Sequence, residues 1–264
     1  MSLVVQATGA DSAPAIVFLH GLGVSSWMWT EQVAALSADY HCLAIDLPGN
    51  GESYRETWHS LADSASQVAA IIRAQAAHGK AHIVGLSLGG YVALQLLGDH
   101  PDVVETVLVS GISTKGLTPA WLYKALVFVV SPLMQWQPYI NMNIKMMQLP
   151  ADAAVLFTRD NKRVRGATLR AIFNEITDFK LPSGLQGRGQ RLLAVAGKLE
   201  AKAIQAGLSA FPQALPQGAA ALVPDAHHGW NGEHPQLFND MIRAWVTGQP
   251  LPNALEPVLA ASSP

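Results

Sequence analysis

The sequence is poor in cysteine and in charged residues, which argues against internal disulfides and against a nucleic-acid partner. Cys42 is the single cysteine, so no internal disulfide can form, and its place in an apolar run favours a reducing compartment. Charged residues make up only 14% of the chain, and the formal net charge is −2. The basic residues form no cluster, so we do not expect a nucleic-acid partner, which would require lysine and arginine concentrated on one surface.

The sequence also lacks a long hydrophobic run. Its most apolar stretch, residues 125–130, is far shorter than the roughly 18 residues that a membrane span needs. The N-terminus has no basic region followed by an apolar stretch, so we expect no signal peptide and no membrane span. Half of the 264 residues are nonetheless hydrophobic, which is enough for a sizeable core. These features predict a soluble, cytoplasmic protein.

The most informative stretch is residues 85–90, which read G-L-S-L-G-G. An apolar, strand-like run precedes it, and a helical pattern follows it. A serine on a tight turn between a strand and a helix is the arrangement called a nucleophile elbow. The turn strains the backbone of Ser87, and side chains two positions to either side would collide with the neighbouring strand and helix. The hydroxyl of Ser87 is thereby exposed beside the N–H groups of a helix start.

Buried strands and helices alternate along the first 112 residues. The expected strands are a first edge strand at 3–5, then 15–19, 42–45, 81–84 and 106–109. A helical pattern follows the second of these strands, another begins after Ser60 as its N-cap, and a third follows Ser87. This alternation predicts an α/β fold with a mostly parallel central sheet and right-handed crossovers.

The alternation stops near residue 113 and resumes near residue 183. The segment between them is helical in pattern and rich in large apolar residues. Its expected helices centre on 121–130, 151–157 and 164–176. After it come strands at 192–196 and 219–223, and helices at 201–208 and from 235. We therefore predict a core formed by 1–112 and 183–248, an inserted helical lid at 113–182, and an extended C-terminal tail at 249–264.

An acyl-transfer serine needs a base, a carboxylate that orients the base, and N–H donors for the oxyanion. On a sheet of this kind the three residues come in the order serine, acid, histidine. The base is then expected after the last strand, where His227 and His228 lie, and the acid after the preceding strand, where Glu200 lies. The backbone N–H groups of Leu88, next to the serine, and of Leu22, in the first strand-to-helix loop, are the expected oxyanion-hole donors.

Five pieces of the chain resemble the α/β-hydrolase family, and they come in the family's order. They are H-G-L-G at 20–23, D-L-P-G-N-G-E-S at 46–53, G-L-S-L-G-G at 85–90, G-K-L-E at 197–200, and the segment around His228. Together they are spread over nearly all of the chain outside the predicted lid. The resemblance implies the α/β-hydrolase fold and a serine hydrolase activity.

The resemblance also separates the two histidines. In family members the catalytic histidine precedes a glutamate by five residues and a proline by seven. Glu233 and Pro235 therefore imply that His228 is the catalytic histidine. The acid position carries Glu200 where aspartate is usual, and Asp225 is the alternative acid.

Large apolar residues of the predicted lid should mostly pack within the lid itself. A few should face the serine because a lid covers the site, and our candidates for the substrate pocket are Trp121, Trp136 and Trp230. An apolar pocket suits an uncharged, ester-like small molecule. We expect no cofactor and no metal, because His227 and its histidine neighbours lack a carboxylate–histidine metal motif. The sequence does not indicate the oligomeric state.

The sequence thus predicts a serine hydrolase that cleaves carboxylic esters of small to medium apolar substrates, with Ser87, His228 and Glu200 as catalytic residues. Lactone opening and carbon–carbon cleavage of diketones use the same residues and stay open. A dinucleotide-dependent oxidoreductase is a weaker alternative, because Ser26 replaces the third glycine of its phosphate-binding loop. A non-catalytic ligand binder on the same scaffold is also weaker, since it would not need the serine and the histidine.

Overall fold

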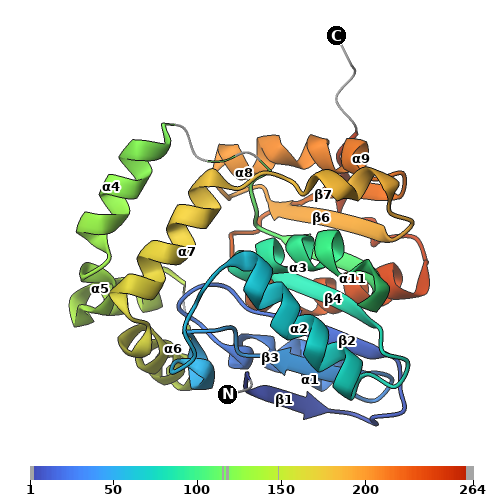
Figure 1. Cartoon of the computed structure of the whole chain (residues 1–264), viewed down its shortest axis with the longest axis horizontal. Coiled ribbons are helices and arrows are strands. Elements are labelled where there is room, and N and C mark those ends of the chain that lie inside the picture. The colour runs from blue at the N-terminus through green and yellow to red at the C-terminus, as the bar shows by residue number, and fades with distance from the viewer. Residues whose placement is uncertain (1–2, 115, 117–118, 148, 260–264) are drawn as a thin grey trace.

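The computed structural model describes residues 3–114, 116, 119–147 and 149–259. Its centre is an eight-stranded sheet in the order β1-β3-β2-β4-β5-β6-β7-β8 (Figure 1). The strands are β1 (Val5–Thr8), β2 (Ala15–Leu19), β3 (His41–Ile45), β4 (Ala81–Leu86), β5 (Val104–Ser110), β6 (Arg191–Gly197), β7 (Gly218–Val223) and β8 (Glu256–Pro257).

Helices follow most of the strands. They are α1 (Thr30–Leu36), α2 (Leu61–Gln75), α3 (Leu88–Asp99), α4 (Ala120–Val130), α5 (Gln137–Met146), α6 (Ala151–Arg163), α7 (Gly166–Asp178), α8 (Lys202–Gly207), α9 (Phe211–Ala214), α10 (Trp230–Glu233) and α11 (Pro235–Thr247). The predicted N-cap of α2 is confirmed, because the hydroxyl of Ser60 accepts the N–H of Asp63 at 3.0 Å. Within the described residues, no helix is both long and apolar enough to cross a bilayer.

Six neighbouring strands, from β3 to β7 in the sheet order, pair in parallel. The edge strands β1 and β8 are antiparallel to β3 and β7. This topology confirms the predicted fold class. Leu19 of β2 lies opposite Ile45 of β3 and Gly85 of β4. The carboxyl ends of these strands therefore meet at one edge of the sheet, which is where ligands bind in open α/β folds.

The core has two layers, one on each face of the sheet. Val17 and Leu19 of β2 pack in the layer under α2 and α3, whereas Ile16 and Phe18 pack in the layer that contains Trp29 and residues of α11. All five residues of β2 are buried. Burial on both faces explains why the central strands are continuous apolar runs in the sequence, without the alternation of a half-exposed strand.

Helices α4 to α7 are inserted between β5 and β6, and Figure 1 shows them beyond the edge of the sheet to which the parallel strands point. In this group α4 packs against α7, and α5 against α6. The sequence pattern predicts three helices here, and the structure has a fourth, α5. Only Ile140 of α5 is buried, so this helix lacks the wide apolar stripe by which amphipathic helices are recognised.

Both ends of the chain add an edge strand to the sheet. The first strand begins at Val5, two residues later than predicted, where its pairing with Ile45 of β3 begins. In the segment predicted as an extended tail, Glu256 pairs with Leu222 of β7, and Leu255 is buried. This part of the segment therefore belongs to the sheet. Residues 260–264 of the predicted tail and residues 115, 117, 118 and 148 of the predicted lid lie outside the described residues.

Candidate active site

Ser87 lies between the end of β4 and the start of α3, with φ 54° and ψ −118°. Such a conformation is costly for a residue other than glycine and persists only where the surroundings enforce it. Part of that enforcement comes from β5, where the carbonyl of Ser110 accepts the Ser87 N–H at 2.8 Å. A Cβ at Gly85 would lie 2.4 Å from the carbonyl oxygen of Gly89, and one at Gly89 would lie 2.0 Å from that of Leu19. These close approaches are the physical reason for the glycines in G-L-S-L-G.

His228 lies in the loop after β7, and Glu200 lies in the turn after β6. The Nδ1 atom of His228 is 2.7 Å from Oε2 of Glu200. The other carboxylate oxygen of Glu200 accepts the Gly197 N–H at 2.8 Å, and only 1% of the glutamate side chain is exposed. An ionised carboxylate can only accept a hydrogen bond, so it favours a proton on Nδ1 of His228, and in the neutral form of that ring Nε2 can accept a proton. This is the tautomer that a general base requires.

Gly111, at the end of β5, is a site residue that the sequence patterns do not reveal. Its φ is +68°, and a Cβ there would lie 2.6 Å from Cε1 of His228 and 3.2 Å from Oε2 of Glu200. A larger residue would therefore displace the imidazole or the carboxylate. A lone glycine after a strand is common in any sequence, so only the folded geometry gives it this meaning.

The alternative acid, Asp225, does not contact His228 in this way. It is exposed, with φ 51°, and its backbone carbonyl lies 3.1 Å from Nε2 of His234. The neighbouring His227 is also exposed, and its backbone N–H donates to Glu233 at 2.9 Å. Glu233 thus fixes the loop that presents His228. Of the two candidate carboxylates, the structure brings Glu200 to the imidazole.

The two expected oxyanion-hole donors lie on either side of the elbow. Leu88 is the first residue of α3, whose N–H has no acceptor within the helix. The loop that contains Leu22 approaches the serine, because a Cβ at Gly21 would lie 3.5 Å from Cβ of Ser87. Among the described residues, neither the Leu22 nor the Leu88 amide has a hydrogen-bond acceptor. Unpaired N–H groups are what an oxyanion hole requires, so the roles of Leu22 and Leu88 stay predictions that this geometry allows.

His20 fixes the peptide unit that carries the Leu22 N–H. Its Nε2 accepts the backbone N–H of Leu47 at 2.9 Å, so its Nδ1 is protonated and donates to the Gly21 carbonyl at 2.6 Å. Burial lowers the pKa of His20, an effect partly opposed by the nearby Asp46, and the neutral ring matches this bonding pattern. The Gly21 carbonyl and the Leu22 N–H belong to one planar unit, so His20 orients that donor.

The three predicted pocket residues have different environments. Trp121 on α4 and Trp136 just before α5 are 71% and 58% exposed. Trp230 is completely buried, and its ring packs against Phe238 while its Nε1 donates to the hydroxyl of Ser110 at 2.9 Å. The prediction that Trp230 faces the substrate pocket is wrong, because the indole fills the core between the sheet and α11.

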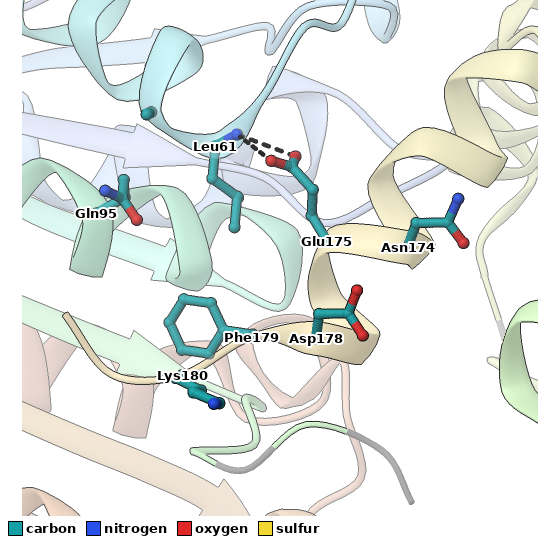
Figure 2. Close-up of a pocket in the computed structure, with 8 residues that line it drawn as sticks. Leu61, Gln95, Asn174, Glu175, Asp178, Phe179 and Lys180 are labelled. Atoms are coloured by element: carbon teal, nitrogen blue, oxygen red, sulfur yellow. Dashed lines mark hydrogen bonds between the residues drawn. The ribbon is translucent and has the colours of Figure 1, made fainter. Parts of the chain in front are cut away.

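A surface cavity of about 390 Å³ lies where α7 meets α2 and α3, away from the elbow (Figure 2). Figure 2 shows Glu175 reaching from α7 to the start of α2. Its carboxylate accepts the Leu61 N–H at 3.0 and 3.2 Å and the Trp58 Nε1–H at 3.0 Å. Burial raises the pKa of Glu175, although these donors favour its ionised form. Glu175 therefore attaches the inserted helices to the core, at a place that the catalytic candidates do not occupy.

The inserted helices expose several large apolar side chains, and some of their charged residues are paired. Arg159 and Arg163 both donate to Glu52, and Lys124 pairs with Asp178. The side chains with large exposed apolar surfaces lie mainly on α4 and α5. They include Trp121, Leu126, Phe128, Val129, Met142 and Met146.

A family model described as Alpha/beta hydrolase family matches residues 16–241. The chain belongs to the α/β-hydrolase family. It is 27% identical to an AB hydrolase superfamily protein of Gibberella zeae over 254 residues, which are 91% of this chain and 83% of the relative. It is 26% identical to the pimeloyl-[acyl-carrier protein] methyl ester esterase of Aeromonas salmonicida over 267 residues, with 93% of this chain and 100% of the relative covered.

A solved α/β-hydrolase structure supports the fold. The enol-lactonase of Burkholderia xenovorans superimposes with a TM-score of 0.70 at 24% identity, and the match covers 93% of this chain and 96% of that chain. At this identity the likeness shows the shared fold alone. The family match and the esterases among its relatives show that the chain is a hydrolase enzyme.

Proposed function

We propose that this α/β hydrolase cleaves carboxylic esters of small to medium apolar compounds through an acyl-enzyme. In this proposal Ser87 is the nucleophile, His228 is the general base and acid, and Glu200 orients and stabilises the imidazole. The observation that carries the proposal is the 2.7 Å contact between His228 and the buried Glu200, found in the same site as a strained serine elbow.

The proposed reaction has two half-reactions that use the same groups. His228 Nε2 takes the proton of Ser87 as its Oγ attacks the ester carbonyl carbon. The carbonyl oxygen becomes an oxyanion that the N–H groups of Leu22 and Leu88 stabilise. The tetrahedral intermediate collapses when His228 gives the proton to the departing alcohol. Water then attacks the acyl-enzyme by the same route and releases the acid.

The charge of the inserted helices supports an uncharged substrate. Arg159, Arg163 and Lys124 already have carboxylate partners, and Lys145, Lys162 and Arg165 are exposed to solvent. Arg170 is half-buried, and it donates to the Ser131 hydroxyl and lies over the Phe128 ring. A substrate carboxylate buried near Ser87 would need a cation of its own. We propose that residues 113–182 act as a lid over Ser87, so that their apolar side chains exclude water and contact the acyl or alkyl group.

A panel of p-nitrophenyl esters of increasing acyl length, measured with the parent enzyme and Ser87→Ala, tests this function. The parent should hydrolyse the esters, and Ser87→Ala should lose on the order of 10⁶ in kcat while it keeps its fold. Equal turnover by both proteins would refute the proposal. Lactones and 1,3-diketones belong in the same panel, because the methyl ester esterase and the enol-lactonase named above show that ester and lactone chemistry both occur on this fold.

A further inference from the structure

Two adjacent polar residues on the inserted helix α6 bind the loop that follows Leu22. Asp160 is completely buried, and its Oδ2 accepts the Ser25 hydroxyl at 2.7 Å and the Trp27 Nε1–H at 2.8 Å. Asn161 is also buried, and its Nδ2 donates to the Gly23 carbonyl at 2.8 Å. Three of the five residues after Leu22 therefore depend on α6 for a hydrogen-bond partner.

The buried charge of Asp160 has a partner of its own. Arg159 donates to Oδ1 of Asp160 from Nε at 2.9 Å and from Nη2 at 2.8 Å, and its Nη1 contacts Glu52 at 2.9 Å. The backbone N–H of Glu52 donates to Asp46 at 2.8 Å, and Asp46 also accepts the N–H of Ser26 at 2.7 Å. The loop is thus held from the core by Asp46 and from the insertion by Asp160 and Asn161, in one connected polar network.

This arrangement places Leu22 between two fixed points. On one side, His20 holds the Gly21 carbonyl, which shares its peptide unit with the Leu22 N–H. On the other side, Asn161 holds the Gly23 carbonyl, in the next peptide unit but one. Without the hydrogen bond from Asn161, the direction of the Leu22 N–H would lose one of its two constraints.

We propose that Asp160 and Asn161 are positioning residues for the reaction, because they hold the loop that carries the Leu22 oxyanion donor. The inserted helices then determine the geometry of the oxyanion hole in addition to covering the site. This inference rests on the proposed ester hydrolysis. It predicts an effect on the transition state rather than on substrate binding, since only the developing oxyanion uses the Leu22 N–H.

The variants Asn161→Ala and Asp160→Asn test the proposal, and Asn161→Ala is the primary one because it removes no charge. The kcat of this variant for a p-nitrophenyl ester should fall by about 10 to 100-fold, and its KM should change less than threefold. This loss is smaller than the roughly 10² to 10³-fold loss of kcat expected when an oxyanion donor is removed completely. A boronic acid forms a tetrahedral anion on a catalytic serine. Its inhibition constant should rise in parallel with the loss of kcat.

Glu175→Gln is the matched control. It weakens a different polar contact between the inserted helices and the core, at the start of α2, without touching the loop after Leu22. This variant should lower the melting temperature about as much as Asn161→Ala does. Its kcat and its inhibition constant for the boronic acid should stay near the parent values. An equal loss of kcat in both variants would mean that general loosening of the insertion is responsible, and would overturn the proposal.

Two further outcomes separate this inference from the proposed function. If Ser87→Ala is inactive but Asn161→Ala keeps the parent kcat and boronic acid affinity, the positioning role is wrong and the function stands. If Ser87→Ala remains active, the proposed function fails first. Should Asp160→Asn not fold, Trp27→Phe removes a single donor to the same carboxylate, and it should show the same parallel loss on a smaller scale.

Discussion

Replacing Glu200 by glutamine tests the proposed catalytic acid, because the structure gives its carboxylate two acceptor roles. Oε2 lies 2.7 Å from His228 Nδ1, and Oε1 accepts the Gly197 N–H at 2.8 Å. A glutamine side chain has one acceptor oxygen and one NH₂ group, so it cannot satisfy both donors in the same rotamer.

Either orientation of the glutamine harms the site. If its oxygen stays with Gly197, its NH₂ group faces Nδ1 and favours the tautomer in which Nε2 carries the proton and cannot accept one from Ser87. If its oxygen faces His228, the NH₂ group opposes the Gly197 N–H in a buried position. In both cases the imidazolium loses its anionic partner. We expect kcat to fall by about 10⁴, equivalent to about 5 kcal/mol of transition-state stabilisation.

The assay is steady-state hydrolysis of a p-nitrophenyl ester, with KM reported separately and the melting temperature as a check on folding. Glu200→Asp should recover part of the rate, because its charge is restored but its carboxylate is one methylene shorter. Asp225→Asn is the control, since Asp225 is exposed and should lose less than threefold. A near-normal Glu200→Gln beside a strongly impaired Asp225→Asn would refute our assignment of the acid.

Two further predictions concern substrate charge and pH. An ester with a carboxylate at the end of its acyl chain should have a kcat/KM at least 10-fold below that of its uncharged analogue, because burying an unpaired carboxylate is costly. A higher kcat/KM for the carboxylate-bearing ester would show that a cation such as Arg165 faces the substrate. Burial lowers the pKa of His20 and His82. Below about pH 6.5 these two histidines therefore bind protons more readily in the unfolded chain than in the folded one. Their contribution should make the free energy of unfolding fall as the pH drops below that value. Urea denaturation at pH 5 and pH 7 measures this, and equal or greater stability at pH 5 would contradict it.

The sheet and its elbow could be predicted because their sequence signals are local. Buried parallel strands appear as continuous apolar runs, and G-L-S-L-G records close backbone contacts within a few residues of Ser87. The order of the motifs along the chain then located Glu200 and His228. These two are 28 residues apart in sequence, yet the fold of β6 and β7 brings them into hydrogen-bond contact.

The features that the sequence did not reveal depend on long-range packing. Trp230 is an aromatic residue two positions after His228, but its burial against Phe238 follows from the position of α11. Asp160 and Asn161 look like ordinary polar helix residues, and their role depends on a loop more than 130 positions earlier in the chain. Helix α5 is not predictable from the sequence, because its single buried residue, Ile140, gives it no periodic pattern.

The most direct test of the proposed mechanism is the mass of the protein after treatment with a fluorophosphonate, followed by peptide mapping. The mechanism predicts one covalent adduct per chain, located on Ser87, in the parent and in Asp225→Asn. It predicts no adduct in Ser87→Ala, and much slower labelling in His228→Ala, because the serine then lacks its base. An adduct on another residue, or full labelling of Ser87→Ala, would contradict the claim that Ser87 is the nucleophile.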